Sequence, residues 1–159
     1  MKTWIAIISF FILLQTDSCS SDDSSDDGGF INENFVEFLG VRSDANGGCN
    51  IETTTGNFSC TYAGAFTSGG LNYAIAVTHE GLCRTASFNL RDNLDQPSNA
   101  VFILQATSDG VAVETYFGNT GTINVTDSGT VTSLRFNGTV INTATGDEET
   151  IEGFVECIL

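Results

Sequence analysis

The sequence predicts an all-β domain, built as an antiparallel β-sandwich or a barrel-like meander of about 8–9 strands. The first observation is composition: Pro occurs once, while Gly, Thr, Asn, Val, Ile and Phe are frequent, which is typical of β proteins with short turns. The second is alternation of apolar and polar residues with a period of two. The third is the regular spacing of turn motifs between the alternating runs.

The alternation is clearest in four segments. Tyr73, Ile75 and Val77 fall on one face of a strand and Ala74, Ala76 and Thr78 on the other, as expected for a half-buried strand. The other three segments repeat this pattern over residues 111–117, 133–137 and 151–157.

Glycine-rich motifs separate these runs. Asp109-Gly110 is the strongest hairpin signal, because both positions tolerate positive φ. Three further turns are expected at Ser68-Gly69-Gly70, Asp127-Ser128-Gly129 and Thr145-Gly146-Asp147.

Three segments are harder to assign. Residues 30–39 fit either a short helix or an edge strand. Residues 89–99 are polar and contain Pro97, so they predict the longest surface loop, where binding would lie. Gly138 interrupts an apolar run as a bulge, a tight packing point or part of a turn; we favour the bulge, because the apolar pattern continues through it.

The N-terminal 18 residues have the order of a secretion signal. Lys2 is followed by an apolar stretch from Trp4 to Leu14, and a small residue, Ser18, precedes Cys19. The apolar stretch is shorter than the about 20 residues that a membrane span needs. Residues 1–18 are therefore predicted to be a signal peptide.

Residues 19–29 combine Cys19 with a tether of Ser, Asp and Gly, which has no apolar group to bury and is expected to be flexible. Leader, cysteine and acidic run together resemble bacterial lipoproteins of Bacteroidota type, although Thr16 and Asp17 depart from the usual lipobox. The resemblance implies diacylglycerol and palmitate on Cys19, with anchoring at the outer membrane and display on the cell surface. The remaining residues, 30–159, form one β domain.

Of the five cysteines, four remain if Cys19 carries lipid, which is an even number in an oxidising compartment. Two disulfides are therefore expected among Cys49, Cys60, Cys83 and Cys157. Three pairings are possible. We favour Cys49–Cys60, which flanks a candidate turn at 54–57, together with Cys83–Cys157.

Charge excludes several classes of partner. The net charge is −15, and the basic residues after Cys19 are Arg42, Arg84, Arg91 and Arg135. Nucleic-acid binding needs a basic surface, so we expect no nucleic-acid partner. An acidic surface keeps a displayed domain soluble or docks a basic partner.

Candidate catalytic groups are few. His79 and Cys83 share one face if the strand continues, which would allow a Cys–His nucleophile, but Cys83 is expected in a disulfide. Glu114 lies in an apolar strand and is expected to face solvent. Asp92 and Asp95 offer oxygen ligands without the order of a calcium loop. We therefore expect no catalytic residue, no metal and no cofactor.

Glycan binding by a β domain usually uses exposed aromatic residues, and Tyr62, Tyr73 and Tyr116 are the tyrosines available. The sequence thus predicts a non-catalytic accessory or interaction subunit of an outer-membrane protein assembly, with a surface ligand- or glycan-binding module as the alternative.

Overall fold

The computed structural model describes residues 34–48, 59–81, 83 and 85–158, which lie in the unit Asn32–Leu159. The predicted signal, Cys19, the tether and Cys49 lie outside these residues. Within the described part, no helix has the length and apolar character to span a membrane. The chain there forms nine strands: β1 (Phe35–Phe38), β2 (Val41–Gly48), β3 (Ser59–Ser68), β4 (Leu71–Glu80), β5 (Ala86–Arg91), β6 (Asn99–Ser108), β7 (Val111–Asp127), β8 (Val131–Asn142) and β9 (Glu148–Ile158).

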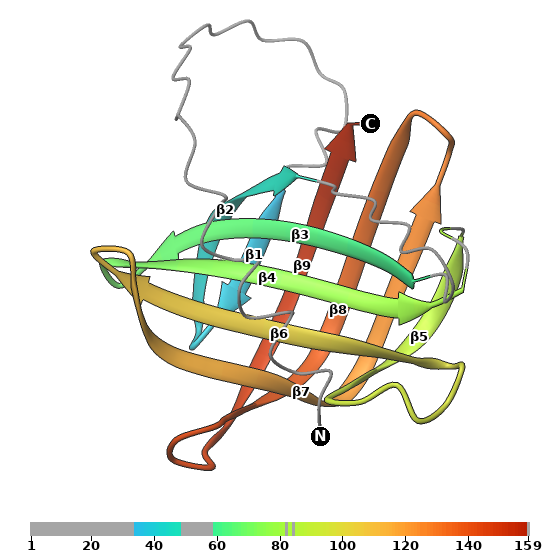
Figure 1. The fold of residues 1–159 in the computed structure, drawn as a ribbon. Coiled ribbons are helices and arrows are strands. Elements are labelled where there is room, and N and C mark those ends of the chain that lie inside the picture. The colour runs from blue at the N-terminus through green and yellow to red at the C-terminus, as the bar shows by residue number, and fades with distance from the viewer. Residues whose placement is uncertain (1–33, 49–58, 82, 84, 159) are drawn as a thin grey trace, which may run out of the picture. The chain divides into compact units, whose positions relative to one another are not determined.

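The strands form one sheet that closes on itself. Their order is β1-β2-β3-β4-β6-β5-β7-β8-β9, and β1 pairs with β9 as well as with β2. All pairings are antiparallel except that of β5 with β6. Figure 1 shows β3, β4 and β6 crossing in front of β8 and β9. The predicted all-β class and strand number are therefore confirmed, and the arrangement is the barrel-like one of the two that were predicted.

One strand interrupts the meander. β5 lies between the first part of β6 and the last part of β7, while the rest of β6 pairs directly with the first part of β7. Two register shifts let β7 bend: Val113 is the extra residue opposite β6, and Asn119 is the extra residue opposite β8. Bulges of this kind increase local twist and bending, which a closed sheet requires.

Three hairpins share one turn type. Gly69-Gly70 and Asp109-Gly110 have positive φ at both positions, which matches a two-residue type I′ turn, and both were predicted. Leu39-Gly40 has the same geometry, with φ of 53° and 72°. It was not predicted, because leucine rarely adopts positive φ. Of the two interpretations for residues 30–39, the helix is wrong for Phe35–Phe38, which form a strand. This strand is not an edge strand, because it pairs with β2 and with β9.

Two other expectations need correction. The loop predicted over 89–99 is shorter, since Asn89–Arg91 belong to β5 and Asn99 to β6. The bulge favoured at Gly138 is wrong: β8 is continuous there, and the extra residue, Asn119, is on β7. Gly138 is instead a tight packing point that pairs with Gly121.

Alternate residues of every strand fill the interior. Tyr73, Ile75 and Val77 are buried as predicted, and so are Leu134 and Phe136 of β8. Among the described residues, a cavity between β3, β4, β8 and β9 measures about 10 Å³. Ligand pockets usually measure about 300–1,000 Å³, so this cavity is too small to hold a ligand. The cavity is lined by Tyr62, Ala63, Gly64, Ile75, Val77, Leu134, Phe136 and Val155.

Gly138→Ala tests the contact between β7 and β8. An added Cβ would meet the carbonyl oxygen of Thr120 and would lie 2.9 Å from the Cα of Gly121, so one backbone must move. We expect a loss of about 1–3 kcal/mol in the free energy of unfolding, measured by urea denaturation. The matched control is Gly64→Ala, whose Cβ would lie 3.4 Å from Val155; it should change stability by less than about 1 kcal/mol. Equal effects of the two substitutions would contradict this packing.

Candidate functional site

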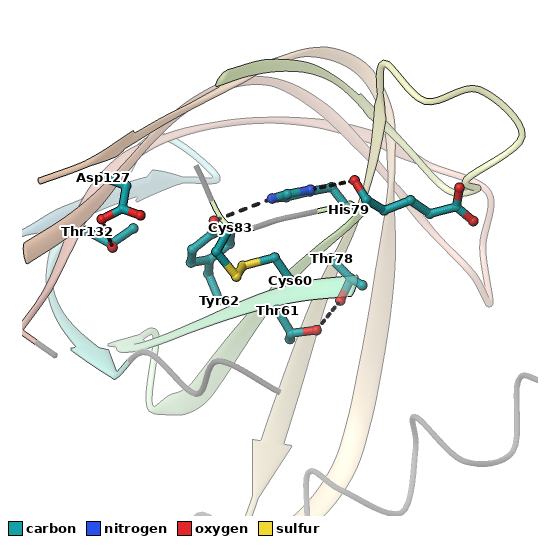
Figure 2. Close-up of a disulfide and its surroundings, with 9 residues drawn as sticks. Cys60, Thr61, Tyr62, Thr78, His79, Cys83, Asp127 and Thr132 are labelled. Carbon is teal, nitrogen blue, oxygen red and sulfur yellow. Dashed lines mark hydrogen bonds between the residues drawn. A yellow bond between two sulfur atoms is a disulfide. The ribbon is translucent and has the colours of Figure 1, made fainter. Parts of the chain in front are cut away.

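A disulfide joins Cys60 of β3 to Cys83, which precedes β5, with the two Cα atoms 5.3 Å apart (Figure 2). The register explains the pairing. Cys60 lies opposite His79 in the β3–β4 ladder, and the chain turns at Gly81, whose φ is 97°. Cys83 therefore reaches Cys60 on β3, the strand that pairs with β4, which the chain has just left.

This disulfide overturns the favoured pairing of Cys49 with Cys60 and of Cys83 with Cys157. The candidate turn at 54–57 suggested that the cysteines on either side of it would pair, but the nearer partner in space is the one that follows β4. Cys49 lies outside the described residues, and the side chain of Cys157 is not described. The expectation that the four cysteines form a second disulfide stays a prediction.

His79 is buried beside this disulfide and is 1% exposed. Its ring stacks on Phe88 with centroids 4.1 Å apart and on Tyr62 with centroids 5.8 Å apart. Nδ1 lies 3.0 Å from the carbonyl oxygen of Glu80, so Nδ1 donates, and the Tyr62 hydroxyl lies 3.4 Å from Nε2. Because the Cys83 sulfur is bonded to Cys60, the Cys–His nucleophile that the spacing allowed is not formed.

Tyr62 lies at the same end of the barrel as His79, on which its ring stacks. Burial raises the pKa of its phenol to about 12, and the negative charge of Asp127 adds to the shift. Asp127 accepts a hydrogen bond from the Gly129 amide at 2.8 Å and lies on the same side of the close-up as Thr132 (Figure 2). The buried phenol of Tyr62 and the buried imidazole of His79 therefore fill the interior at this end of the barrel.

Four aromatic rings fill the opposite end, where the hairpins β1–β2, β3–β4 and β6–β7 turn. Phe66 stacks on Tyr73 at 4.8 Å between centroids. Phe38 meets the rings of Tyr73 and Tyr116 edge-on at 5.6 and 5.2 Å. This cluster joins β1, β3, β4 and β7 across the barrel.

Glu114 belongs to this cluster, which corrects the expectation that it faces solvent. Its Oε2 accepts a hydrogen bond from the Tyr116 hydroxyl at 2.7 Å. Burial and this hydrogen bond raise the pKa of Tyr116 to about 12. Glu114 and Tyr116 share a face of β7 that turns inward, whereas Val111 and Val113 are 65% and 50% exposed. The alternation of residues 111–117 was recognised from the sequence, but alternation alone does not say which face is buried.

In the loop after β5, the side-chain oxygens of Asp92 and Asn93 accept hydrogen bonds from the loop itself and from Asn99. Asn93 accepts hydrogen bonds from the Asp95 amide at 3.2 Å and from the Asn99 side chain at 3.4 Å, and it donates to Asp92 at 2.8 Å. Among the described residues, no three acidic, His or Cys side chains form a group suited to a metal ion.

The three tyrosines are buried, with exposed fractions of 2% for Tyr62 and 4% for both Tyr73 and Tyr116. A glycan platform needs an exposed aromatic face, so these residues do not supply one. In comparisons with protein-family models, curated proteins and solved structures, none matches this chain.

The tyrosines give a pH prediction. The pKa of Tyr73 is also raised, mainly by burial. Folding therefore favours the neutral phenol at all three positions, and protons that the unfolded chain releases near pH 10 stay bound in the folded one. Stability should be intact below pH 10 and should fall as pH rises towards 12.

Ultraviolet absorbance of tyrosinate measures this directly. In the folded chain the phenolate signals of Tyr62 and Tyr116 should rise only towards pH 12, together with the loss of structure seen by circular dichroism. The signal of Tyr73 should also appear at a higher pH than in the unfolded chain. The same chain in denaturant should titrate near pH 10. A phenolate component of the folded chain that titrates near pH 10 would contradict the burial of these rings. Tyr116→Phe should remove one of the shifted titrations.

Proposed function

We propose that this chain is a lipoprotein of the outer membrane, displayed on the cell surface, and that it acts as a non-catalytic accessory or interaction subunit of an envelope protein assembly. The location is supported by the leader, Cys19 and the acidic tether of residues 19–29. In this proposal the lipid anchors the chain and the tether separates the β domain from the membrane.

The observation that carries the role is the filled interior of the barrel. Eight-stranded barrels that bind small ligands leave an open interior, whereas the cavity described between β3, β4, β8 and β9 is about 10 Å³. Aromatic clusters occupy both ends: Tyr62, His79 and Phe88 at one, and Phe38, Phe66, Tyr73 and Tyr116 at the other. A barrel filled in this way can bind a partner only on its outer surface. This favours recognition of another macromolecule over binding of a small ligand.

The chemistry of the described residues supports a non-catalytic role. The sulfur of Cys83 is consumed by the disulfide, and the buried His79 is stacked between two rings. Glu114 is held by the Tyr116 hydroxyl. Each of these groups has a structural use. The alternative, a glycan-binding module, is not favoured, because the tyrosines that would form its platform are buried.

Isolation of the full chain from detergent-solubilised membranes tests the proposal. We expect one or more proteins to co-purify in stoichiometric amounts. Metabolic labelling should place palmitate on the wild-type chain and not on the matched variant Cys19→Ala, which should also leave the membrane fraction. Recovery of the labelled chain alone would contradict the interaction role, and label that survives Cys19→Ala would contradict the anchor.

A further inference from the structure

The hairpin of β6 and β7 extends beyond the end of β8. The last pair between β7 and β8 joins Tyr116 to Asn142, and the Thr143 amide then donates to the Thr115 carbonyl at 2.9 Å. Before Thr115, residues Val111, Ala112 and Glu114 pair with β6 on one side, and Val113 is the extra residue between them. Among the residues that the structure describes, no strand pairs with them on the other side.

This segment is a short open sheet edge. Alternate residues of a strand direct their N–H and C=O groups to opposite sides, so Val111–Glu114 present backbone groups away from β6. Natural proteins usually protect such an edge with lysine, proline or a covering loop. Here the segment carries Val111, Ala112 and Val113, all of them exposed. Figure 1 shows the β6–β7 turn reaching out on the left.

The exposed side chains of this segment are apolar, and acidic residues occur in the β6–β7 turn and after the β8–β9 connection. Val111 and Val113 are 65% and 50% exposed. Asp109 lies in the β6–β7 turn, and residues 147–149, Asp-Glu-Glu, follow the connection whose Thr143 bonds to Thr115. A partner with basic and apolar residues in alternation would complement this edge.

The described arginines do not neutralise these acids. Arg42 lies over the ring of Phe35 at 3.5 Å, and Arg135 lies over the ring of Phe154 at 5.4 Å. Arg91 donates to the carbonyl oxygens of Leu90 and Asn119 at 2.8 and 3.0 Å. Each of these guanidinium groups therefore contacts residues outside the edge Val111–Glu114.

Two features argue against a second copy of this chain as the occupant. The net charge is −15, and two such edges placed side by side would bring the same acidic residues together. The extra residue at Val113 also interrupts a flat ladder, which limits open-ended pairing. A single short strand from a basic partner avoids the charge repulsion and needs no ladder that continues past the extra residue.

We propose that the edge Val111–Glu114 accepts a short extended segment of a basic partner protein, which adds to β7 as an extra strand. Main-chain hydrogen bonds would supply affinity, and contacts with Val111 and Val113 would supply specificity, as in other cases of strand addition. This inference rests on the proposed interaction role and names the surface that carries it.

Synthetic peptides test the edge without knowledge of the natural partner. The probe is a ten-residue peptide of alternating Lys and Val, added to the purified full-length chain and followed by fluorescence anisotropy. Two controls keep its length: a peptide of alternating Glu and Val, and a Lys–Val peptide with alternate amides N-methylated. The second control keeps the charge but cannot form the strand ladder, so it separates strand addition from general attraction to an acidic chain.

Variants of the chain locate the site. Val111→Lys combined with Val113→Lys should weaken binding of the Lys–Val peptide at least tenfold. The matched control is Leu39→Lys combined with Val41→Lys, because these residues are each 50% exposed in the β1–β2 hairpin; binding should stay within twofold of wild type. Amide NMR of the wild-type chain supplies an independent readout, in which the peptide should shift and protect the amides of residues 111–115.

The outcomes separate this inference from the proposed function. Tight binding of the N-methylated peptide, equal binding by both double variants, or NMR shifts confined to other strands would overturn the edge proposal. Wild-type dimers that the Val111→Lys, Val113→Lys variant abolishes would assign the edge to a second copy and would also overturn it. If membrane isolation yields a partner that this variant still holds, the interaction role stands and the edge proposal fails.

Discussion

The pairing of β1 with β9 is the constraint on which the rest of the structure depends. β1 is four residues long, from Phe35 to Phe38, yet it pairs with β2 on one side and β9 on the other. Asn34 reinforces the closure, because its side chain accepts from the Glu156 amide at 2.8 Å and its carbonyl accepts from the Ala45 amide at 3.0 Å. Closing a sheet removes its long edges, and alternate residues of all the strands then face a single interior.

Closure determines where recognition can occur. With the interior occupied by side chains and a cavity of about 10 Å³, the ends and the outer face of the barrel remain. One end is held by the Cys60–Cys83 disulfide and the buried His79. The other end is less regular, since the β6–β7 hairpin continues past β8. The open edge there is a consequence of unequal strand lengths around a closed sheet.

The sequence allowed the fold class, most strands and two of the type I′ turns to be predicted, because period-two alternation and Asp-Gly or Gly-Gly pairs act over a few residues. The Leu39-Gly40 turn could not be predicted in that way, since its positive φ is imposed by β1 pairing on both sides. Glu114 faces inward because it shares the face of the buried Tyr116, and the alternation alone does not say which face of β7 is buried. The partner of Cys60 depends on how the chain returns after β4. All three are tertiary effects, whereas the burial of Tyr73, Ile75 and Val77 follows from local pattern.

Cross-strand NMR contacts between β1 and β9 test the closed barrel most directly. Nuclear Overhauser effects should connect the backbone of Val36 with that of Gly153 and the backbone of Phe38 with that of Ile151, and the amides of β1 should exchange slowly with solvent. An open sandwich would leave β1 paired with β2 alone. Absence of these contacts, with rapid exchange of the β1 amides that face β9, would contradict the closure on which this account depends.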